Sequence, residues 1–165
     1  MAVIVVMGVA GAGKSTIGTA LAGHLGVEYA EADEFHPASN IEKMTSGVPL
    51  TDADRWPWLR SIADWIRAHA GTGGVVTCSA LKYEYRDVLR GGGAVWFLHL
   101  DGARELLATR MGGRSGHFMP TSLLDSQLAD LSPLRQDEHG RTLDIGAPPD
   151  ELVEAAITAY RKDHP

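Results

Sequence analysis

The sequence contains a single cysteine, Cys78, so it can form neither an internal disulfide nor a paired-cysteine metal site. Its seven histidines lack the H-x-x-x-H spacing of metal ligands, which argues against a structural metal. No apolar run approaches the roughly 20 residues that a membrane-spanning helix needs. Met1 leads directly into a strand-like segment without a basic region or a cleavage site, so we expect no signal peptide. These absences favour a cytoplasmic protein that does not enter a membrane.

The chain also lacks an excess of basic residues. It carries 15 Lys and Arg against 21 Asp and Glu, for a formal net charge of −6. That balance argues against a nucleic-acid-binding domain and against a polybasic membrane anchor. The 165 residues are the usual length of one domain, and 44% hydrophobic with 22% charged residues is typical of a globular protein. Because there is no internal repeat or long linker, we expect a single domain over residues 1–165.

What the chain does contain is an alternation of two kinds of segment. Apolar, β-branched segments predict strands over residues 3–7, 27–32, 75–79, 95–100 and 142–145. Apolar residues at helical spacing predict helices over residues 14–25, 59–70, 81–89, 103–111 and 151–160. Thr51 and Asp52 offer capping side chains for the second helix, and Pro57 must lie in its first turn or kink it. This alternation indicates an α/β fold with a parallel sheet.

Residues 8–15 match the phosphate-binding pattern G-x-x-x-x-G-K-[ST] in full, between a predicted buried strand and a predicted helix. Glycines let successive backbone N–H groups face phosphate oxygens without Cβ clashes, and the helix start adds its positive dipole end. In this role Lys14 reaches the β- and γ-phosphates, and the Ser15 hydroxyl binds Mg²⁺. The pattern says nothing of the acceptor. The residues expected here to bind ATP are Gly8, Val9, Ala10, Gly11, Ala12, Gly13, Lys14, Ser15 and Thr16.

Three further blocks of sequence carry more specific information. The first consists of Phe35-His36-Pro37, Asn40, Lys43-Met44, Gly47, Pro49-Leu50, Asp52, Asp54-Arg55 and Pro57-Trp58-Leu59. The second consists of Cys78-Ser79-Ala80-Leu81-Lys82, Tyr85-Arg86-Asp87 and Leu89-Arg90. The third consists of Arg114, Gly116-His117-Phe118-Met119-Pro120, Leu123-Leu124 and Ser126-Gln127. Together, in this order and spacing, they closely resemble the signature of the gluconokinases, which are small P-loop kinases of a sugar acid.

The resemblance spans nearly the whole chain and implies both a fold and an activity. The implied fold is of the P-loop NTPase type, similar to shikimate and adenylate kinases: three α/β/α layers, a five-stranded parallel sheet and a mobile lid. The implied activity is transfer of the γ-phosphate of ATP to the 6-hydroxyl of D-gluconate, which gives 6-phospho-D-gluconate and ADP, with Mg²⁺ as cofactor. The resemblance also favours a homodimer.

A carboxylate is expected beside the phosphate loop. Asp33 ends the second predicted strand, at the edge of the sheet where ligands of such folds collect. There it can accept the proton of the attacking hydroxyl, although capping the next segment is an alternative role. Glu31 points to the same side of that strand. The family usually has Asp at this position, so the resemblance implies that Glu31 is an outer-shell partner of Mg²⁺.

Gluconate is a linear polyol with one carboxylate, so its site needs cations and hydrogen-bonding side chains. Arginine suits a carboxylate because its planar fork binds both oxygens. Which cation contacts the carboxylate stays open, and each of them could instead be a solvated surface charge. Asp52 and Asp54 are expected to cap the helix and orient Arg55. The candidate acceptor-binding residues are Asp33, His36, Lys43, Arg55, Lys82, Arg86, His117 and Gln127.

Glycines surround the third block and suggest a mobile lid over about residues 111–130. Within it Arg114 is the third expected catalytic residue, beside Asp33 and Lys14, because its guanidinium can stabilise charge that develops on the phosphate oxygens. Arg110 lies on the apolar stripe of the preceding helix, where it either reaches the nucleotide or extends to solvent. Residues 144–148 resemble the adenine-side loop of the family.

Two alternatives stay open on sequence grounds. One is another P-loop kinase that acts on shikimate or on a related sugar acid. The other is a regulatory module that senses a sugar acid without phosphorylating it, which the presence of Asp33 and a complete lid argues against. Cys78 is expected to pack as a small apolar residue, and Ser79 lacks the G-x-S-x-G setting of a hydrolase nucleophile.

Overall fold

The computed structural model describes residues 2–112 and 121–165 of the chain. Its centre is a five-stranded sheet with the order β2-β3-β1-β4-β5, in which every neighbouring pair is parallel. The strands are β1 (Val3–Met7), β2 (Glu28–Glu31), β3 (Gly74–Thr77), β4 (Val95–Asp101) and β5 (Gly140–Asp144). The predicted α/β fold with five parallel strands is confirmed, and each strand lies within a few residues of its expected place.

Helices connect the strands and cover the sheet. They are α1 (Lys14–Leu25), the short 3-10 helix η1 (Ala32–Phe35), α2 (Ala38–Thr45), α3 (Asp52–Ala68), α4 (Tyr83–Arg90), α5 (Arg104–Gly112), α6 (Thr121–Asp130) and α7 (Pro149–Asp163). The sequence did not predict η1, α2 or α6. The reason is clear in α2, where the buried residue is Asn40 while Ile41 and Met44 are half exposed, so no apolar stripe marks the helix.

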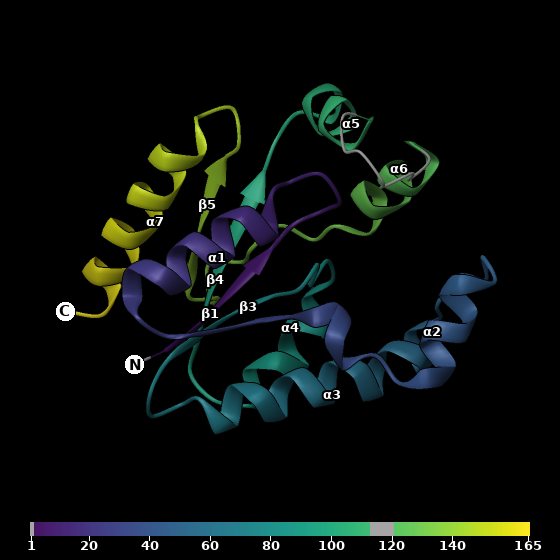
Figure 1. Ribbon diagram of the computed structural model, residues 1–165, viewed down its shortest axis with the longest axis horizontal. Helices are drawn as coiled ribbons and strands as arrows, with labels where there is room; N and C mark the ends of the chain where they lie inside the picture. Colours follow the sequence, from purple (N-terminus) through teal and green to yellow (C-terminus); the bar gives the residue numbers. More distant parts are fainter. Residues whose placement is uncertain (1, 113–120) are drawn as a thin grey trace.

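The sheet is buried between two helical layers (Figure 1). All five residues of β1 are buried, and their side chains alternate between the two faces of the sheet. Ile4 and Val6 pack in the cluster that contains α1 and α7, whereas Val3, Val5 and Met7 pack in the cluster that contains α3 and α4. The three-layer α/β/α arrangement is therefore present, and it explains why β1 is a continuous apolar run.

The ends of the helices follow from local sequence. Helix α1 ends at Gly26, whose left-handed backbone (φ 65°) lets its N–H donate to the carbonyl of Ala22. Helix α3 begins with a capping box, because the Asp54 N–H donates to the Thr51 hydroxyl at 3.2 Å and the Thr51 N–H donates to the Asp54 carboxylate at 2.9 Å. This cap sets the helix start at Asp52, so Pro57 lies inside α3, beyond the first turn that was one of the two settings expected for it.

The carboxyl ends of the central strands face the part of the molecule that carries α2, α5 and α6, and both termini lie at the opposite end (Figure 1). Helix α6 occupies most of the second half of the region expected to form a lid. Among the described residues, no helix combines the length and the apolar composition needed to cross a bilayer.

Candidate active site

A cavity of about 680 Å³ opens at the carboxyl edge of the sheet. The phosphate loop, the segment after β2, the end of β3 and the first turn of α3 all contribute to its wall, as do single residues of α5 and α6. The predicted site residues that it brings together are Ala10, Gly11, Gly13, Lys14, Ser15, Glu31, Asp33, His36, Arg55 and Gln127.

The phosphate loop has the backbone that its glycines permit. Gly13 lies directly before α1 with a left-handed φ of 88°, and Gly11 has a φ of 83°. A side chain on Gly11 would also collide with the carbonyl of Leu107 in α5, because its Cβ would lie 2.9 Å from that oxygen. Val9 and Ala12 are buried under the loop, so they can take part only through their backbone. The loop is therefore an open nest at the start of a helix, the arrangement that binds phosphate.

Lys14 extends back along this loop. Its ammonium group donates to the carbonyl of Gly8 at 3.0 Å and to that of Val9 at 3.1 Å. Ser15 follows in the first turn of α1 and lines the cavity, whereas Thr16 is exposed. The N–H of Gly8 donates to the carbonyl of Ser79 at 3.3 Å, which ties the loop to the segment after β3. The charged group of Lys14 is thus held over the entrance of the loop, where a bound phosphate would lie.

Asp33 lies in η1 rather than at the end of a strand, because β2 ends two residues earlier, at Glu31. Strand β3 lies between β2 and β1, yet both carboxylates line the same cavity as the phosphate loop. The indole N–H of Trp58 donates to the carbonyl of Ala32 at 2.7 Å and so fixes the η1 turn. The Tyr29 hydroxyl donates to Glu31 at 2.8 Å. The cavity therefore has phosphate-binding groups on one wall and carboxylates on another.

His36 and Arg55 form the wall next to Asp33. The imidazole of His36 stacks on Trp58, with ring centroids 4.4 Å apart, and its Nδ1 lies 3.2 Å from the amide nitrogen of Asn40. Burial lowers the pKa of His36, with the nearby Asp33 charge opposing the shift and Arg55 adding to it, so the ring is neutral at pH 7. The guanidinium of Arg55 is therefore the charged group of this wall.

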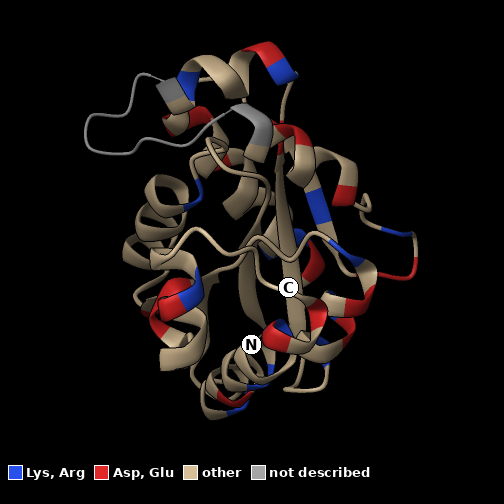
Figure 2. Ribbon diagram, turned by 90° about the vertical axis from the view of Figure 1, so that its right-hand side faces the viewer, with Lys and Arg blue, Asp and Glu red and all other residues tan. Residues whose placement is uncertain are grey.

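Lys43 and Lys82, like Arg86 below, are predicted acceptor-binding cations that do not line the cavity. Lys43 pairs with the Asp54 carboxylate at 2.9 and 2.8 Å, and Lys82 lies 3.5 Å from Asp52, outside the lining. Within residues 2–112 and 121–165, the Lys and Arg side chains that line the cavity are Lys14 and Arg55. Elsewhere Lys and Arg are interspersed with Asp and Glu along the helices (Figure 2). Neighbouring acidic groups thus explain why Lys43 and Lys82 stay outside the site.

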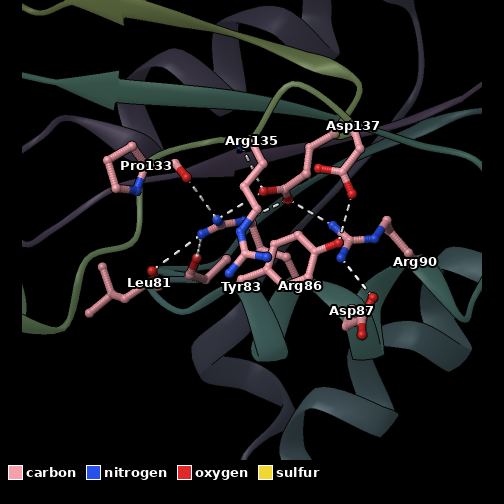
Figure 3. A network of polar contacts seen from close by, with 10 residues as sticks. Leu81, Tyr83, Arg86, Asp87, Arg90, Pro133, Arg135 and Asp137 are labelled. Atoms are coloured by element: carbon pink, nitrogen blue, oxygen red, sulfur yellow. Dashed lines mark hydrogen bonds and ion pairs between the residues drawn. The ribbon is translucent and has the colours of Figure 1, made fainter.

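Arg86 is a correction of the sequence prediction. Its side chain is fully buried and binds both oxygens of the buried Glu138, at 2.7 and 3.0 Å. The same guanidinium donates to the carbonyls of Ala80, Leu81 and Pro133 (Figure 3). Every nitrogen of the group is engaged by the protein, so Arg86 holds two segments together and does not bind substrate.

Gln127 and Arg110 both make hydrogen bonds with the protein, and of the two only Gln127 lines the cavity. The amide oxygen of Gln127, from α6, accepts a hydrogen bond of 2.7 Å from the N–H of Ala10 in the phosphate loop. Arg110, from α5, donates to the carbonyl of Ile145 at 2.7 Å and so contacts the loop expected to lie beside adenine. Arg114 and His117 lie outside the described residues.

Sequence reasoning missed several lining residues, among them Leu50, Trp58, Thr77 and Met111. Trp58 is nearly buried, but it lines the cavity beside His36, whose imidazole stacks on one face of its ring. Thr77 could have been found from its place at the carboxyl end of β3. Cys78 is buried, which raises its thiol pKa to about 12, so it is not a nucleophile at neutral pH.

The oxygen donors of the cavity fit Mg²⁺ carried by a nucleotide. The Ser15 hydroxyl, Glu31 and Asp33 all line it, and such hard oxygen ligands suit this ion. In the described part of the chain there is no group of three or more His, Cys, Asp or Glu side chains that could hold a metal. Mg²⁺ is usually held by few protein ligands together with phosphate oxygens and water, so this donor set is sufficient.

Comparison with known proteins agrees with this geometry. Residues 10–121 match the sequence model of the shikimate kinase family. The chain is 47% identical to the gluconokinase of Gluconobacter oxydans (strain 621H), over 97% of this chain and 92% of that protein. A crystal structure of a sugar kinase from Janibacter sp. HTCC2649 is 54% identical, with a TM-score of 0.91 over 98% of this chain and 95% of the other.

A crystal structure of a gluconokinase from Sinorhizobium meliloti 1021 is 44% identical, with a TM-score of 0.89. That match covers 98% of this chain and 92% of the other. Identities of this size over nearly the whole length show that the chain belongs to the gluconokinase family of P-loop kinases.

Proposed function

We propose that this protein is a gluconokinase that transfers the γ-phosphate of ATP to the 6-hydroxyl of D-gluconate, with 6-phospho-D-gluconate and ADP as products. The observation that carries the proposal is the content of one cavity. The phosphate loop, the carboxylate of Asp33 and the guanidinium of Arg55 all line it. A kinase for an acidic polyol needs these three groups: a phosphate cradle, a proton acceptor and a cation for the acceptor's charge.

On the nucleotide side, the backbone N–H groups of the loop and the start of α1 bind the phosphates of ATP. The hydrogen bonds from Lys14 to the carbonyls of Gly8 and Val9 are exchanged for stronger, charge-assisted ones to phosphate oxygens. Ser15 would hold Mg²⁺, with Glu31 as its outer-shell partner, and the ion would neutralise charge on the phosphates. Arg110 and the loop after β5 lie toward the base, and Arg114 adds positive charge at the transferring group.

On the acceptor side, Asp33 accepts the proton of the 6-hydroxyl as that oxygen closes on the γ-phosphate. Asp33 is exposed within the cavity, so it can meet a hydroxyl without prior rearrangement. Arg55 binds the carboxylate at the other end of the acceptor, and neutral His36 offers a hydrogen bond to a hydroxyl between them. His117 completes this set as an expectation from sequence, and Gln127 bridges toward the phosphate loop.

The remaining expectations concern the whole protein. We propose that it is a single kinase domain over residues 1–165 with a lid over about residues 111–130. We also propose that it acts in the cytoplasm as a homodimer, with D-gluconate and ATP as its small-molecule partners and without binding nucleic acid. The first of these expectations is supported by the two hydrophobic clusters, because both pack against the same sheet.

ADP release measured with and without D-gluconate tests the proposal, and phosphorus NMR of the product identifies the hydroxyl that is phosphorylated. We expect release that depends on gluconate and a product phosphorylated at position 6. A sensor that binds gluconate without turnover would give no gluconate-dependent release. A shikimate kinase would give release with shikimate in its place.

A further inference from the structure

We infer that Tyr85 is a positioning residue for acceptor specificity. With Asp52, its hydroxyl holds the guanidinium of Arg55 in the orientation that binds the carboxylate of the acceptor. The inference rests on the proposed function and concerns two residues, neither of which lines the cavity. They act through Arg55, which does.

The hydroxyl of Tyr85 connects two charged groups of opposite sign. It donates to Asp52 Oδ1 at 2.5 Å, and it accepts a hydrogen bond from Arg55 Nη1 at 3.3 Å. The Tyr85 ring is buried at 4% exposure and packs edge-on against Trp56, with centroids 5.6 Å apart. Asp52 and Arg55 are more exposed, at 48% and 30% of their side chains. Tyr85 therefore gives two partly exposed side chains one buried point of attachment.

These contacts leave the edge of the Arg55 guanidinium formed by Nε and Nη2 available for an anion. In the described part of the chain, the side-chain hydrogen bond of Arg55 is made through Nη1, and Nη1 is also its closest atom to Asp52, at 3.6 Å from Oδ1. A guanidinium binds both oxygens of a carboxylate through two parallel N–H groups, and Nε with Nη2 forms such a pair. Because Nη1 is held by the Tyr85 hydroxyl, the guanidinium keeps one orientation, and the edge formed by Nε and Nη2 keeps one direction. The fork is then prepared for an anion in the cavity.

The charge of Asp52 makes this arrangement necessary. The carboxylate is shared with Lys82, whose ammonium lies 3.5 Å from Oδ1 and 5.5 Å from the Tyr85 ring centroid. The pKa of Asp52 is lowered, chiefly by the hydrogen bond from Tyr85, and the pKa of Tyr85 is raised, chiefly by burial. At neutral pH the Tyr85 hydroxyl therefore remains the donor and the Asp52 carboxylate remains the acceptor. Without the hydroxyl, Asp52 can close from 3.6 Å to hydrogen-bond distance of Arg55 and draw its charge away from the acceptor.

The test replaces Tyr85 by Phe, which removes the hydroxyl and keeps the buried ring. A matched control exists on the same helix. The Tyr83 hydroxyl donates to Asp137 at 2.8 Å, and its ring lies against Arg90 and Arg135, outside the cavity (Figure 3). Tyr83→Phe thus also removes a hydrogen bond from a tyrosine of α4 to an aspartate. This hydrogen bond does not involve Arg55.

Steady-state kinetics are measured with D-gluconate, with its neutral amide D-gluconamide, and with ATP. For Tyr85→Phe we expect KM for gluconate to rise at least ~5-fold, with kcat and KM for ATP within ~2-fold of wild type. The preference for gluconate over gluconamide should fall by a similar factor, because the neutral amide does not use the charge of Arg55. Tyr83→Phe should match wild type in every parameter. In an Arg55→Met background, Tyr85→Phe should produce no further loss of this preference.

An unchanged preference in Tyr85→Phe, in a wild-type enzyme that phosphorylates gluconate, would overturn this inference and leave the proposed function intact. Equal losses for gluconate, gluconamide and ATP would also overturn it, since they would assign Tyr85 a purely structural role. If the wild-type protein shows no gluconate-dependent ADP release, the proposed function fails first, and the inference fails with it.

Discussion

Lys14 and Asp33 approach the cavity from different strands of the sheet and carry opposite charges. Lys14 follows β1, and its ammonium group already lies against the carbonyls that border the phosphate loop. Asp33 follows β2 and is held by η1, whose carbonyl at Ala32 accepts a hydrogen bond from Trp58. The separation of these two roles means that their substitutions should fail in different ways.

Replacing Lys14 by Ala should lower kcat by at least ~10²-fold, because the transition state loses a positive charge at the transferring phosphoryl group. The fold should persist, since Lys14 is only partly buried and its hydrogen bonds to Gly8 and Val9 are with carbonyls of the phosphate loop itself. Lys162→Ala, at an exposed position near the end of α7, is the matched control. Turnover and circular dichroism measured on both variants check this. Near-normal kcat in Lys14→Ala would rule out the phosphate-loop assignment.

Replacing Asp33 by Asn preserves the shape of the side chain but removes its basicity. If Asp33 takes the proton of the 6-hydroxyl, kcat should fall by ~10²–10⁴-fold while the dissociation constant for gluconate changes far less. Calorimetric binding and turnover measured on the same sample separate these effects. Glu34→Gln is the control, because Glu34 is the exposed neighbour of Asp33 and does not line the cavity. Equal losses in binding and turnover would make Asp33 a positioning ligand instead.

At the scale of elements, α4 shows where the sequence prediction failed and why. Tyr85 and Arg86 are adjacent in the second block of the gluconokinase signature, but a helix turns successive side chains by about 100°. One side chain therefore faces Arg55 and the other faces Glu138. The sequence identified this block correctly, but it could not show which side of α4 Tyr85 and Arg86 each face. Glu138 lies outside the three blocks, so no local signal marked it as the partner of Arg86.

The ion pair of Arg86 and Glu138 joins α4 to the segment before β5. Replacing Glu138 by Gln should destabilise the fold by roughly 3 kcal/mol, because Arg86 stays buried without its counter-charge. Chemical denaturation at pH 7 measures this loss. Asp137→Asn, at the adjacent exposed carboxylate, should change stability little. Equal stability of the two variants would contradict the structural role given to Arg86.

The pH dependence of the same pair has a definite sign. Burial tends to raise the pKa of Glu138, but hydrogen bonds from Arg86 and the Arg135 backbone outweigh it and hold the pKa below its usual 4.5. A lowered folded-state pKa contributes stability above the unfolded value, and this contribution is lost as pH falls through the folded one. The stability difference between wild type and Glu138→Gln should therefore shrink in acid.

At the scale of the whole molecule, the order of strands and helices could be predicted because apolar periodicity and glycine breaks mark it. The five strands and helices α1, α3, α4, α5 and α7 follow that pattern. Neither η1 nor α2 could be predicted in this way, since η1 is only four residues long and the buried residue of α2 is Asn40. In α6, Leu124 and Leu128 pack against the same hydrophobic cluster at helical spacing, but in the sequence the glycines around this segment suggest a lid. The position of β3 between β1 and β2 was not predictable either, because it depends on long-range pairing. The sequence therefore identified the type of chemistry at the site better than it identified the elements that surround the cavity.

The specificity constants for D-gluconate, D-glucose and shikimate, measured in one ADP-release assay, test the central claim most directly. In the proposed function, Arg55 binds the carboxylate of the acceptor and Asp33, which lines the same cavity, accepts the proton of the hydroxyl at the other end of its chain. Glucose has no carboxylate to pair with Arg55, and shikimate is a ring rather than an extended chain. We predict kcat/KM at least ~10²-fold higher for gluconate than for either alternative. A comparable value for glucose or for shikimate would contradict the account.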